Sequence, residues 1–235
     1  MPKRIGILGG ISHESTIAYY DLLLHKHFAR SKNYHYPEIV IFSLNFQKFT
    51  DYEDNGDPVN YIRYILEGVR ALEAAGVDFI LMAANSPHAV FDAVALQAKV
   101  PMLSIVAATA QAALQTGARK LLLIGIKFTM QADFYPRAFA ELGLTVMTPS
   151  EVEQDEINHI IFDELVIGHF TAQSKARLLA LIEQYAHTAG IDGVILGCTE
   201  LPLLLQQEDC RIKLFDTLDL HATAALDFAL LDKFV

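Results

Sequence analysis

Cys198 lies in the segment Gly-Cys-Thr-Glu-Leu-Pro, directly after an apolar run. We expect a strand to end at Gly197 and a short helix to begin near Glu200, with Thr199 as its cap. A thiol just ahead of a helix N-terminus feels the positive end of the helix dipole, which lowers its pKa and raises the thiolate fraction. The pattern therefore favours a reactive thiol. The alternative is a buried, inert cysteine, which is a common state of free thiols.

The pattern around this cysteine occurs a second time in the chain. Segment 76–88, GVDFILMAANSPH, aligns with segment 190–202, GIDGVILGCTELP. The aligned positions of like character are Gly76 with Gly190, Asp78 with Asp192, and Asn85 with Thr199. Ala84 falls opposite Cys198. One copy thus ends its strand on a thiol, and the other ends on a methyl group, which cannot carry a proton.

The ANSPH segment is typical of a strand-to-helix turn, with Ser86 as the cap and Pro87 at the first helical position. Asn85 and Ser86 then offer side-chain and backbone donors to a carboxylate at the helix start. The alternative is that this turn only caps the helix. His88 follows on the first turn, where a packing or capping role is more common than that of a base.

Further candidates for substrate binding follow other predicted strand ends. The opening segment GILGGISHEST lacks the fingerprints G-x-G-x-x-G and G-K-[ST], so a nucleotide site is not expected. We interpret it as a glycine turn that lets a small carboxylate approach the backbone. The substrate α-carboxylate is expected to be held by the polar turns that contain Asn85–Ser86 and Thr199, with Ser12 of the glycine turn as a further donor. Weaker candidates are Lys127 and Thr129 in GIKFTM, and Lys48 after LNFQ, which is placed to meet a side-chain carboxylate.

The composition is that of a compact globular protein. Of the 235 residues, 52% are hydrophobic and 20% are charged, and the formal net charge is -10. This balance argues against nucleic-acid and anionic-membrane partners, which require clustered Lys and Arg. No apolar run approaches the ~18 residues of a transmembrane helix, and the start MPKRIGILGG is predicted to be a strand rather than a signal peptide. We therefore expect a cytoplasmic protein.

Cys198 and Cys210 are the only cysteines of the chain. Two cysteines do not make a disulfide framework, and neither has a metal-ligand spacing such as C-x-x-C, so no metal site is predicted. A reducing compartment fits this usage. Cys210 lies in the charged loop QQEDCRIK, where we expect no functional role.

Eight short apolar runs without polar alternation are typical of strands buried on both faces. They are RIGILGG, EIVIFSL, VDFILMA, VPMLSIV, KLLLIGI, LTVMTPS, DGVILGC and IKLFDT. Longer stretches of helical period lie between them, among them 59–76 and 174–190. Strands and helices therefore alternate, which predicts an α/β protein with parallel sheets covered by helices.

The doubled pattern predicts two pseudo-twofold-related α/β halves that face each other across a cleft. We place the first half at residues 1–100 plus 208–235, and the second at residues 101–207. Because ligands collect beyond the carboxyl ends of parallel strands, Ala84 and Cys198 are expected on opposite walls of this cleft. The alternative is a single doubly wound sheet in which the similarity of the two halves is accidental.

Together these segments resemble the cofactor-independent aspartate/glutamate racemases over almost the whole chain. The resemblance rests on IGILGGISHESTIAYYDLL, IGIKFTMQADFY, IIFDEL with the following GHF, GVILGCTELPLL and LFDTLDLHATAA. The Gly-Cys-Thr-Glu stretch is highly specific in this context. The opening and FTMQADFY are similar to the aspartate-racemase-like branch.

The resemblance implies a homodimer that uses no pyridoxal phosphate and no metal. Two thiols would flank the α-carbon of a bound amino acid, one removing the proton and the other returning one from the opposite face, so that positioning and electrostatics must lower the barrier. The sequence departs from this scheme at Ala84, which replaces the first cysteine. Asn45 stands where relatives often have an acidic residue, and Ile167 where some have a basic one.

Three functions compete at this point. The first is an amino-acid racemase of the aspartate/glutamate type with Cys198 as the surviving base, and with water or a group such as His13 serving the other face. The second is a decarboxylase-like enzyme, which needs one cysteine to protonate a carbanion on one face. The third is a non-catalytic amino-acid-binding relative.

Overall fold

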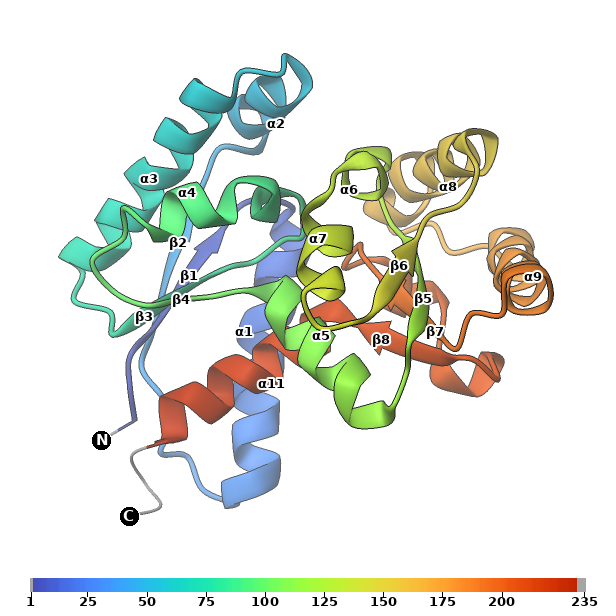
Figure 1. The fold of residues 1–235 in the computed structure, drawn as a ribbon. Coiled ribbons are helices and arrows are strands. Elements are labelled where there is room, and N and C mark those ends of the chain that lie inside the picture. The colour runs from blue at the N-terminus through green and yellow to red at the C-terminus, as the bar shows by residue number, and fades with distance from the viewer. Residues whose placement is uncertain (1, 232–235) are drawn as a thin grey trace. The chain divides into compact units, whose positions relative to one another are not determined.

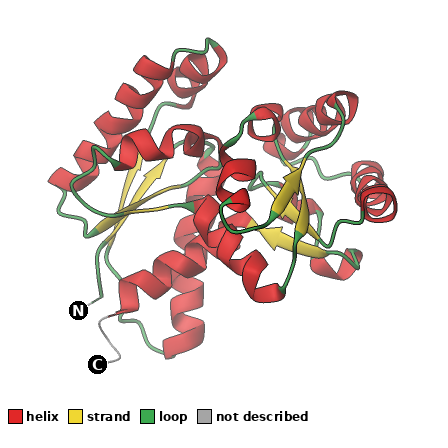
Figure 2. Cartoon of the chain, viewed as in Figure 1, coloured by secondary structure: helices red, strands yellow, loops and turns green. Residues whose placement is uncertain are grey.

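The computed structural model describes residues 2–231, which form two compact units. The first unit contains residues 2–105 and 221–231, and the second contains residues 106–220. Each unit has one four-stranded sheet with helices around it (Figures 1 and 2). The predicted α/β fold with two parallel sheets is confirmed.

The sheet of the first unit has the strand order β2-β1-β3-β4, and all its pairs are parallel. Its strands are β1 (Ile5–Gly9), β2 (Ile39–Ser43), β3 (Phe79–Met82) and β4 (Met102–Leu103). Its helices are α1 (His13–Ser31), α2 (Phe46–Asp54), α3 (Pro58–Ala74), the 3-10 helix η1 (Ser86–Val90), α4 (Phe91–Ala95) and most of α11 (Thr217–Leu230).

Helices cover both faces of this first sheet. α1 and α11 share one face, because Tyr19 Oη of α1 lies 2.8 Å from His221 Nδ1 of α11 and is hydrogen-bonded to it. Phe228 of α11 packs edge-on against Phe79 of β3 on that face. α3 packs on the other face through a glycine, Gly68, where an added Cβ would lie 2.4 Å from Leu8 Cδ1. The close approach of α3 to the sheet therefore depends on this glycine.

The sheet of the second unit has the order β6-β5-β7-β8, and its pairs are again parallel. Its strands are β5 (Lys120–Ile124), β6 (Thr145–Met147), β7 (Gly193–Leu196) and β8 (Lys213–Asp216). Its helices are α5 (Ile105–Thr116), whose first residue Ile105 belongs to the first unit, α6 (Lys127–Gln131), α7 (Phe134–Ala140), α8 (Glu151–Asp163), η2 (Leu165–Ile167), α9 (Ala172–Ala189), α10 (Leu201–Leu204) and η3 (Gln207–Asp209).

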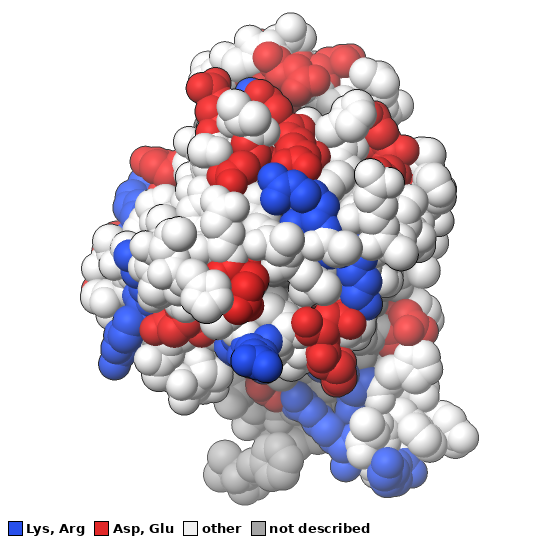
Figure 3. All heavy atoms as spheres, turned by 90° about the vertical axis from the view of Figure 1, so that its right-hand side faces the viewer, with Lys and Arg blue, Asp and Glu red and all other residues white. Residues whose placement is uncertain are grey.

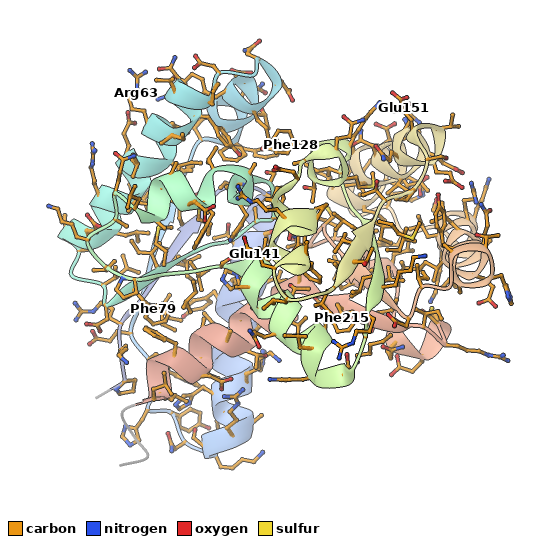
Figure 4. All side chains as sticks on the ribbon, viewed as in Figure 1. Arg63, Phe79, Phe128, Glu141, Glu151 and Phe215 are labelled. Atoms are coloured by element: carbon orange, nitrogen blue, oxygen red, sulfur yellow. The ribbon has the colours of Figure 1, made fainter. Side chains whose placement is uncertain are left out.

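The core of each unit lies between its sheet and its helices. In the second unit, Ile161 of α8 and Ile182 of α9 pack in one cluster with strand residues such as Val194. Figure 4 shows Phe79 and Phe215 within the strand layers of their units, where both are buried. Burial of this apolar surface is the main favourable term that holds the strand ends in place.

The central strands of the two units repeat one another bond for bond. Asp78 N–H donates to Arg4 O, and Asp192 N–H donates to Lys120 O, each at 2.9 Å. At the other end of the same strand pairs, Ala83 N–H donates to Leu8 O and Gly197 N–H donates to Ile124 O. The glycines that end the preceding helices, Gly76 and Gly190, both have positive φ. Ala84 and Cys198 therefore follow equivalent strand ends.

The eight strands lie where the apolar runs predict them, but β2 is not buried on both faces. It is an edge strand, and Ile41 and Phe42 are 41% and 36% exposed. The predicted boundary at residue 207 is also wrong in part. β8 pairs with β7 in the second sheet, so residues 208–220 belong to the second unit. The predicted start of the second half at residue 101 is wrong as well, because β4 pairs with β3 and residues 101–105 belong to the first unit. Residues 1 and 232–235 of the predicted first half lie outside the described residues.

On the face drawn in Figure 3, acidic and basic side chains are interspersed. Within residues 2–231, no helix has the length and apolar character needed to span a bilayer. In the same range, no cluster of three or more His, Cys, Asp or Glu side chains is arranged to hold a metal ion.

Candidate active site

Cys198 follows β7 and is hydrogen-bonded to a carboxylate. Its Sγ donates to Glu200 Oε2 at 3.0 Å, and Thr199 Oγ1 donates to the same oxygen at 2.9 Å. Cys198 is 9% exposed and Glu200 is 4% exposed. The second unit thus presents a thiol and a carboxylate as one nearly buried pair.

The prediction of a lowered thiol pKa is wrong. Burial raises the pKa of Cys198 well above its ordinary value, and the Glu200 carboxylate raises this pKa further through its charge and its hydrogen bond. The helix after the cysteine, α10, has only four residues, and its cap is Glu200 rather than Thr199. Its dipole is too small to offset the burial and the adjacent charge. The resting side chain is therefore a thiol, and Glu200 is the acceptor nearest to its proton.

Thr129 lies against the strand end that leads to this cysteine. It belongs to α6, is fully buried, and its hydroxyl has no hydrogen-bond partner among the described residues. A Cβ added to Gly197 would lie 3.4 Å from Thr129 Cγ2, so the methyl group faces the Gly197 backbone. A buried hydroxyl without a partner is unfavourable.

Lys127, another predicted binding residue of the second unit, is held by α8. Its ammonium donates to Asp155 Oδ1 at 2.5 Å, and its N–H donates to Asn158 Oδ1 at 2.8 Å. The hydrogen bond to Asp155 raises the pKa of Lys127. Ile167 of η2, in the position where relatives can be basic, is 71% exposed.

The equivalent strand end of the first unit carries Ala84, which is 8% exposed. His88 ties this strand end to α5. Its Nδ1 donates to Ala84 O at 3.0 Å, and its Nε2 accepts from Ile105 N–H at 3.1 Å. Burial lowers the pKa of His88 to about 3, and the neighbouring His221 contributes to this shift. His88 is therefore a neutral structural residue with both ring nitrogens engaged.

Ser86 has a different role from the predicted helix cap. It is the first residue of η1, and its side chain hydrogen-bonds Glu53 of α2 and Tyr61 of α3. Tyr61 Oη donates to Glu53 Oε1 at 2.8 Å. Asn85 occupies the cap position without a side-chain capping bond, and it is 5% exposed. The turn after Ala84 therefore contains two buried polar side chains, and one of them, Ser86, is hydrogen-bonded to a carboxyl group.

The Gly-Gly turn after β1 is explained by packing within the first unit. A Cβ added to Gly9 would lie 2.4 Å from Thr16 Cγ2, and one added to Gly10 would lie 2.3 Å from Leu44 O. Gly10 also has positive φ and donates its N–H to Thr16 Oγ1. These close contacts are enough to explain why glycine is required at both positions, whether or not the turn binds a ligand. Ser12 caps α1 in an uncommon positive-φ conformation, and its Oγ accepts from Ser15 N–H.

The remaining candidates of the first unit lie on helix starts. Asn45 caps α2 by accepting from Lys48 N–H at 3.0 Å, and Lys48 Nζ lies 4.1 Å from the centre of the Tyr64 ring. His13, considered for the face opposite Cys198, is 76% exposed and lies 3.0 Å from a carboxylate oxygen of Glu14. Neither Lys48 nor His13 joins the buried groups around Ser86.

Sequence reasoning missed three polar residues near the strand ends. Glu200 stands two positions after Cys198 in the motif, and this closeness in sequence is the signal that could have identified it. Glu53 and Tyr61 carry no such signal. Both are hydrogen-bonded to Ser86, but Glu53 is 33 positions away from it in the sequence and Tyr61 is 25 positions away. Cys210 is half-buried, and burial raises its thiol pKa.

The fold and the thiol at the end of β7 define a class of proteins. The model of the family described as Asp/Glu/Hydantoin racemase matches residues 8–225 of the chain. The chain belongs to this family.

Three similar proteins each align with more than nine tenths of this chain. A crystal structure of an aspartate racemase homologue from Pyrococcus horikoshii OT3 has 41% identity and a TM-score of 0.87, and covers 97% of this chain and 99% of that one. A putative Asp/Glu racemase from Yersinia pestis has 32% identity and a TM-score of 0.90 over the same shares of the two chains. The broad specificity amino-acid racemase RacX of Bacillus subtilis (strain 168) is 27% identical over 91% of this chain and 92% of its own length.

Proposed function

We propose that the protein is an amino-acid racemase of the aspartate/glutamate type that uses neither pyridoxal phosphate nor a metal. One observation carries the proposal: in a chain of the racemase family, the thiol of Cys198 donates a hydrogen bond to the buried carboxylate of Glu200. The sequence similarity to a broad specificity amino-acid racemase supports the same reaction class. Aspartate and glutamate are the first substrates to test.

The proposed proton transfer begins at the Cys198–Glu200 pair. The thiol proton moves to Glu200, and the thiolate then removes the α-proton of the amino acid, whose bonding electrons stay on the α-carbon as a carbanion. A proton returned to the opposite face gives the other enantiomer. A high resting thiol pKa suits this cycle, because a strongly basic thiolate is needed to take a weakly acidic α-proton. The reverse reaction begins with a thiol that is already protonated.

The substrate carboxylates need hydrogen-bond donors at the strand ends. We propose Thr129 in the second unit as one of them, because its buried hydroxyl has no partner among the described residues. We propose Thr199, Asn85, Ser86 and Ser12 as further binding residues for the polar groups of the amino acid. Lys127 and Lys48 are weaker proposals, since Lys127 is paired with Asp155 and Lys48 lies over Tyr64.

Chiral chromatography of aspartate and glutamate tests the proposed function. Wild type should convert each L-enantiomer into its D-enantiomer and the reverse, and Cys198→Ala should lose about 10²–10⁴-fold in rate or more. Cys210→Ala is the matched control and should keep the wild-type rate. Asn85→Ala should raise the KM for the converted amino acid.

Other outcomes would replace the proposal. A product that lacks one carboxyl group would identify a decarboxylase that protonates a carbanion with one cysteine. Tight binding of an amino acid without any conversion would identify a binding protein. Full activity of Cys198→Ala would show that the chemistry lies elsewhere.

A further inference from the structure

A carboxyl group lies beside the strand end that lacks a thiol. Glu53, near the end of α2, accepts a hydrogen bond from Tyr61 Oη at 2.8 Å. Its carboxyl group is also hydrogen-bonded to the side chain of Ser86. Ser86 stands two residues after Ala84, the position equivalent to Cys198. All of these residues belong to the first unit.

This carboxyl group is shielded from water. Tyr61 and Ser86 are 3% and 6% exposed, and Glu53 is half-buried. Burial raises the pKa of Glu53, while the hydrogen bonds from Tyr61 and Ser86 lower it and the charge of Asp54 raises it. The net effect is upward, which brings the carboxyl group closer to the range in which it gives and takes protons at physiological pH.

The bond between Glu53 and Ser86 allows a proton to move between them. A hydroxyl group has one proton and two lone pairs. When Glu53 is ionised, the Ser86 hydroxyl donates to it. When Glu53 is protonated, it donates to Ser86 Oγ, and the serine proton is free to point elsewhere. The protonation state of Glu53 thus decides whether Ser86 presents a proton or a lone pair beyond this bond.

Other groups near this strand end do not serve as well. His88 has backbone partners on both ring nitrogens and stays neutral. His13 is exposed and lies beside Glu14. Tyr61 has a pKa raised well above its ordinary value, first by burial and then by the charge of Glu53, so it stays protonated and positions the carboxyl group.

Resting on the racemase function proposed above, we propose that Glu53 and Ser86 form a proton relay that serves the Ala84 face of the substrate α-carbon. In one direction, Ser86 gives its proton to the carbanion and takes the proton of Glu53, which becomes a carboxylate. In the other direction, the carboxylate takes the serine proton as Ser86 takes the α-proton. Protons and charge balance in both directions, and no further reactant is needed.

Exchange of the α-hydrogen in D₂O, followed by proton NMR on each enantiomer separately, tests the relay. Glu53→Gln keeps the size of the side chain but cannot ionise. The enantiomer whose α-hydrogen faces Cys198 should still exchange in this variant. Its inversion, and the exchange of the other enantiomer, should fall by about 10²-fold or more. Glu67→Gln, at an exposed position of α3, is the matched control and should behave as wild type.

The pH profile separates a proton relay from a structural role. The carboxyl group faces Tyr61 of α3 and Ser86 of η1, with Asp54 next to it on α2. Tyr61→Phe removes a hydrogen bond that lowers the pKa of Glu53, so the limb of the inversion profile that reports this carboxyl group should move to higher pH. Ser86→Ala should show the same one-sided loss as Glu53→Gln.

The possible results separate this relay from the proposed function. If wild type inverts an amino acid and Glu53→Gln does so equally fast, the relay is wrong and the racemase function stands. Equal losses for both enantiomers in a folded Glu53→Gln variant would also contradict it, because they would indicate a structural role. If wild type neither exchanges nor inverts any amino acid, both the function and the relay are wrong.

Discussion

At the scale of single residues, the pairing of Cys198 with Glu200 controls the chemistry of the thiol. An isolated buried thiol would resist ionisation, and a neighbouring carboxylate makes ionisation harder still. The same carboxylate is placed to receive the proton when the thiol reacts. Glu200 therefore has two opposing effects on Cys198, and they can be measured separately.

Glu200→Gln should lower the pKa of the Cys198 thiol, because the charge and the accepted hydrogen bond of the carboxylate both raise it. The same change should slow racemisation by about 10²-fold or more, since the proton acceptor is lost. The pH dependence of iodoacetamide alkylation in a Cys210→Ala background measures the first effect. Glu208→Gln, at an exposed position of η3, is the control. An unchanged alkylation midpoint would show that Glu200 does not govern the thiol.

At the scale of elements, His88 holds the Ala84 strand end against the start of α5. Its two ring nitrogens bond Ala84 O and Ile105 N–H, and its ring stacks on Phe91 with the centroids 5.2 Å apart. Burial of polar backbone groups is tolerated here because the imidazole satisfies both of them.

His88→Ala should reduce the free energy of unfolding by about 3 kcal/mol, because it removes a hydrogen bond from each of two backbone groups and opens a cavity. Urea denaturation measures the loss. His159→Ala is the control, since the His159 side chain is 79% exposed and pairs with Asp163 on its own helix; about 0.5 kcal/mol or less is expected there. Equal stabilities of the two variants would contradict the bridging role of His88.

The elements themselves could be predicted because their signals are local. Runs such as KLLLIGI have the length and residue types of buried strands. Asp78 and Asp192 repeat for a common reason, because each carboxylate accepts a hydrogen bond from a backbone N–H group at the start of the neighbouring strand. The surroundings of the site could not be predicted in the same way. The raised pKa of the Cys198 thiol depends on burial, and the hydrogen bond between Ser86 and Glu53 depends on how α2 packs. Neither of these leaves a periodic pattern in the sequence.

At the scale of the whole molecule, two buried histidines link stability to pH. Burial lowers the pKa of His88 to about 3 and that of His221 to about 4, against about 6.5 in an unfolded chain. Below pH 6.5 the unfolded chain therefore binds protons that the folded chain does not, and stability falls as the pH falls.

Between pH 6.5 and 5, the free energy of unfolding should drop with a slope of up to about 2.7 kcal/mol per pH unit, the limit for two protons. Urea denaturation at a series of pH values measures the slope. His88→Ala removes one of the two groups and should reduce the slope toward half. A flat profile from pH 7 to pH 5 would contradict the burial of two neutral histidines.

Self-association is a further prediction for the whole molecule. Ile17 and Tyr20 of α1 and Ile41 and Phe42 of β2 are exposed apolar residues of the first unit. We predict a homodimer, so static light scattering should give about twice the 26.1 kDa of one chain. A mass of one chain at micromolar concentration would contradict the prediction.

The central claim is that Ala84 and Cys198 follow equivalent strand ends of the two units, and that only Cys198 supplies a thiol to the proposed racemase reaction. The rate of aspartate inversion by Ala84→Cys, measured by chiral chromatography beside wild type, tests it most directly. We expect the rate to rise toward the ~10²-fold or more that a direct general acid/base contributes, and the gain should vanish when Cys198 is also replaced by Ala. A folded Ala84→Cys variant that inverts aspartate no faster than wild type, or one whose gain survives the loss of Cys198, would contradict the account.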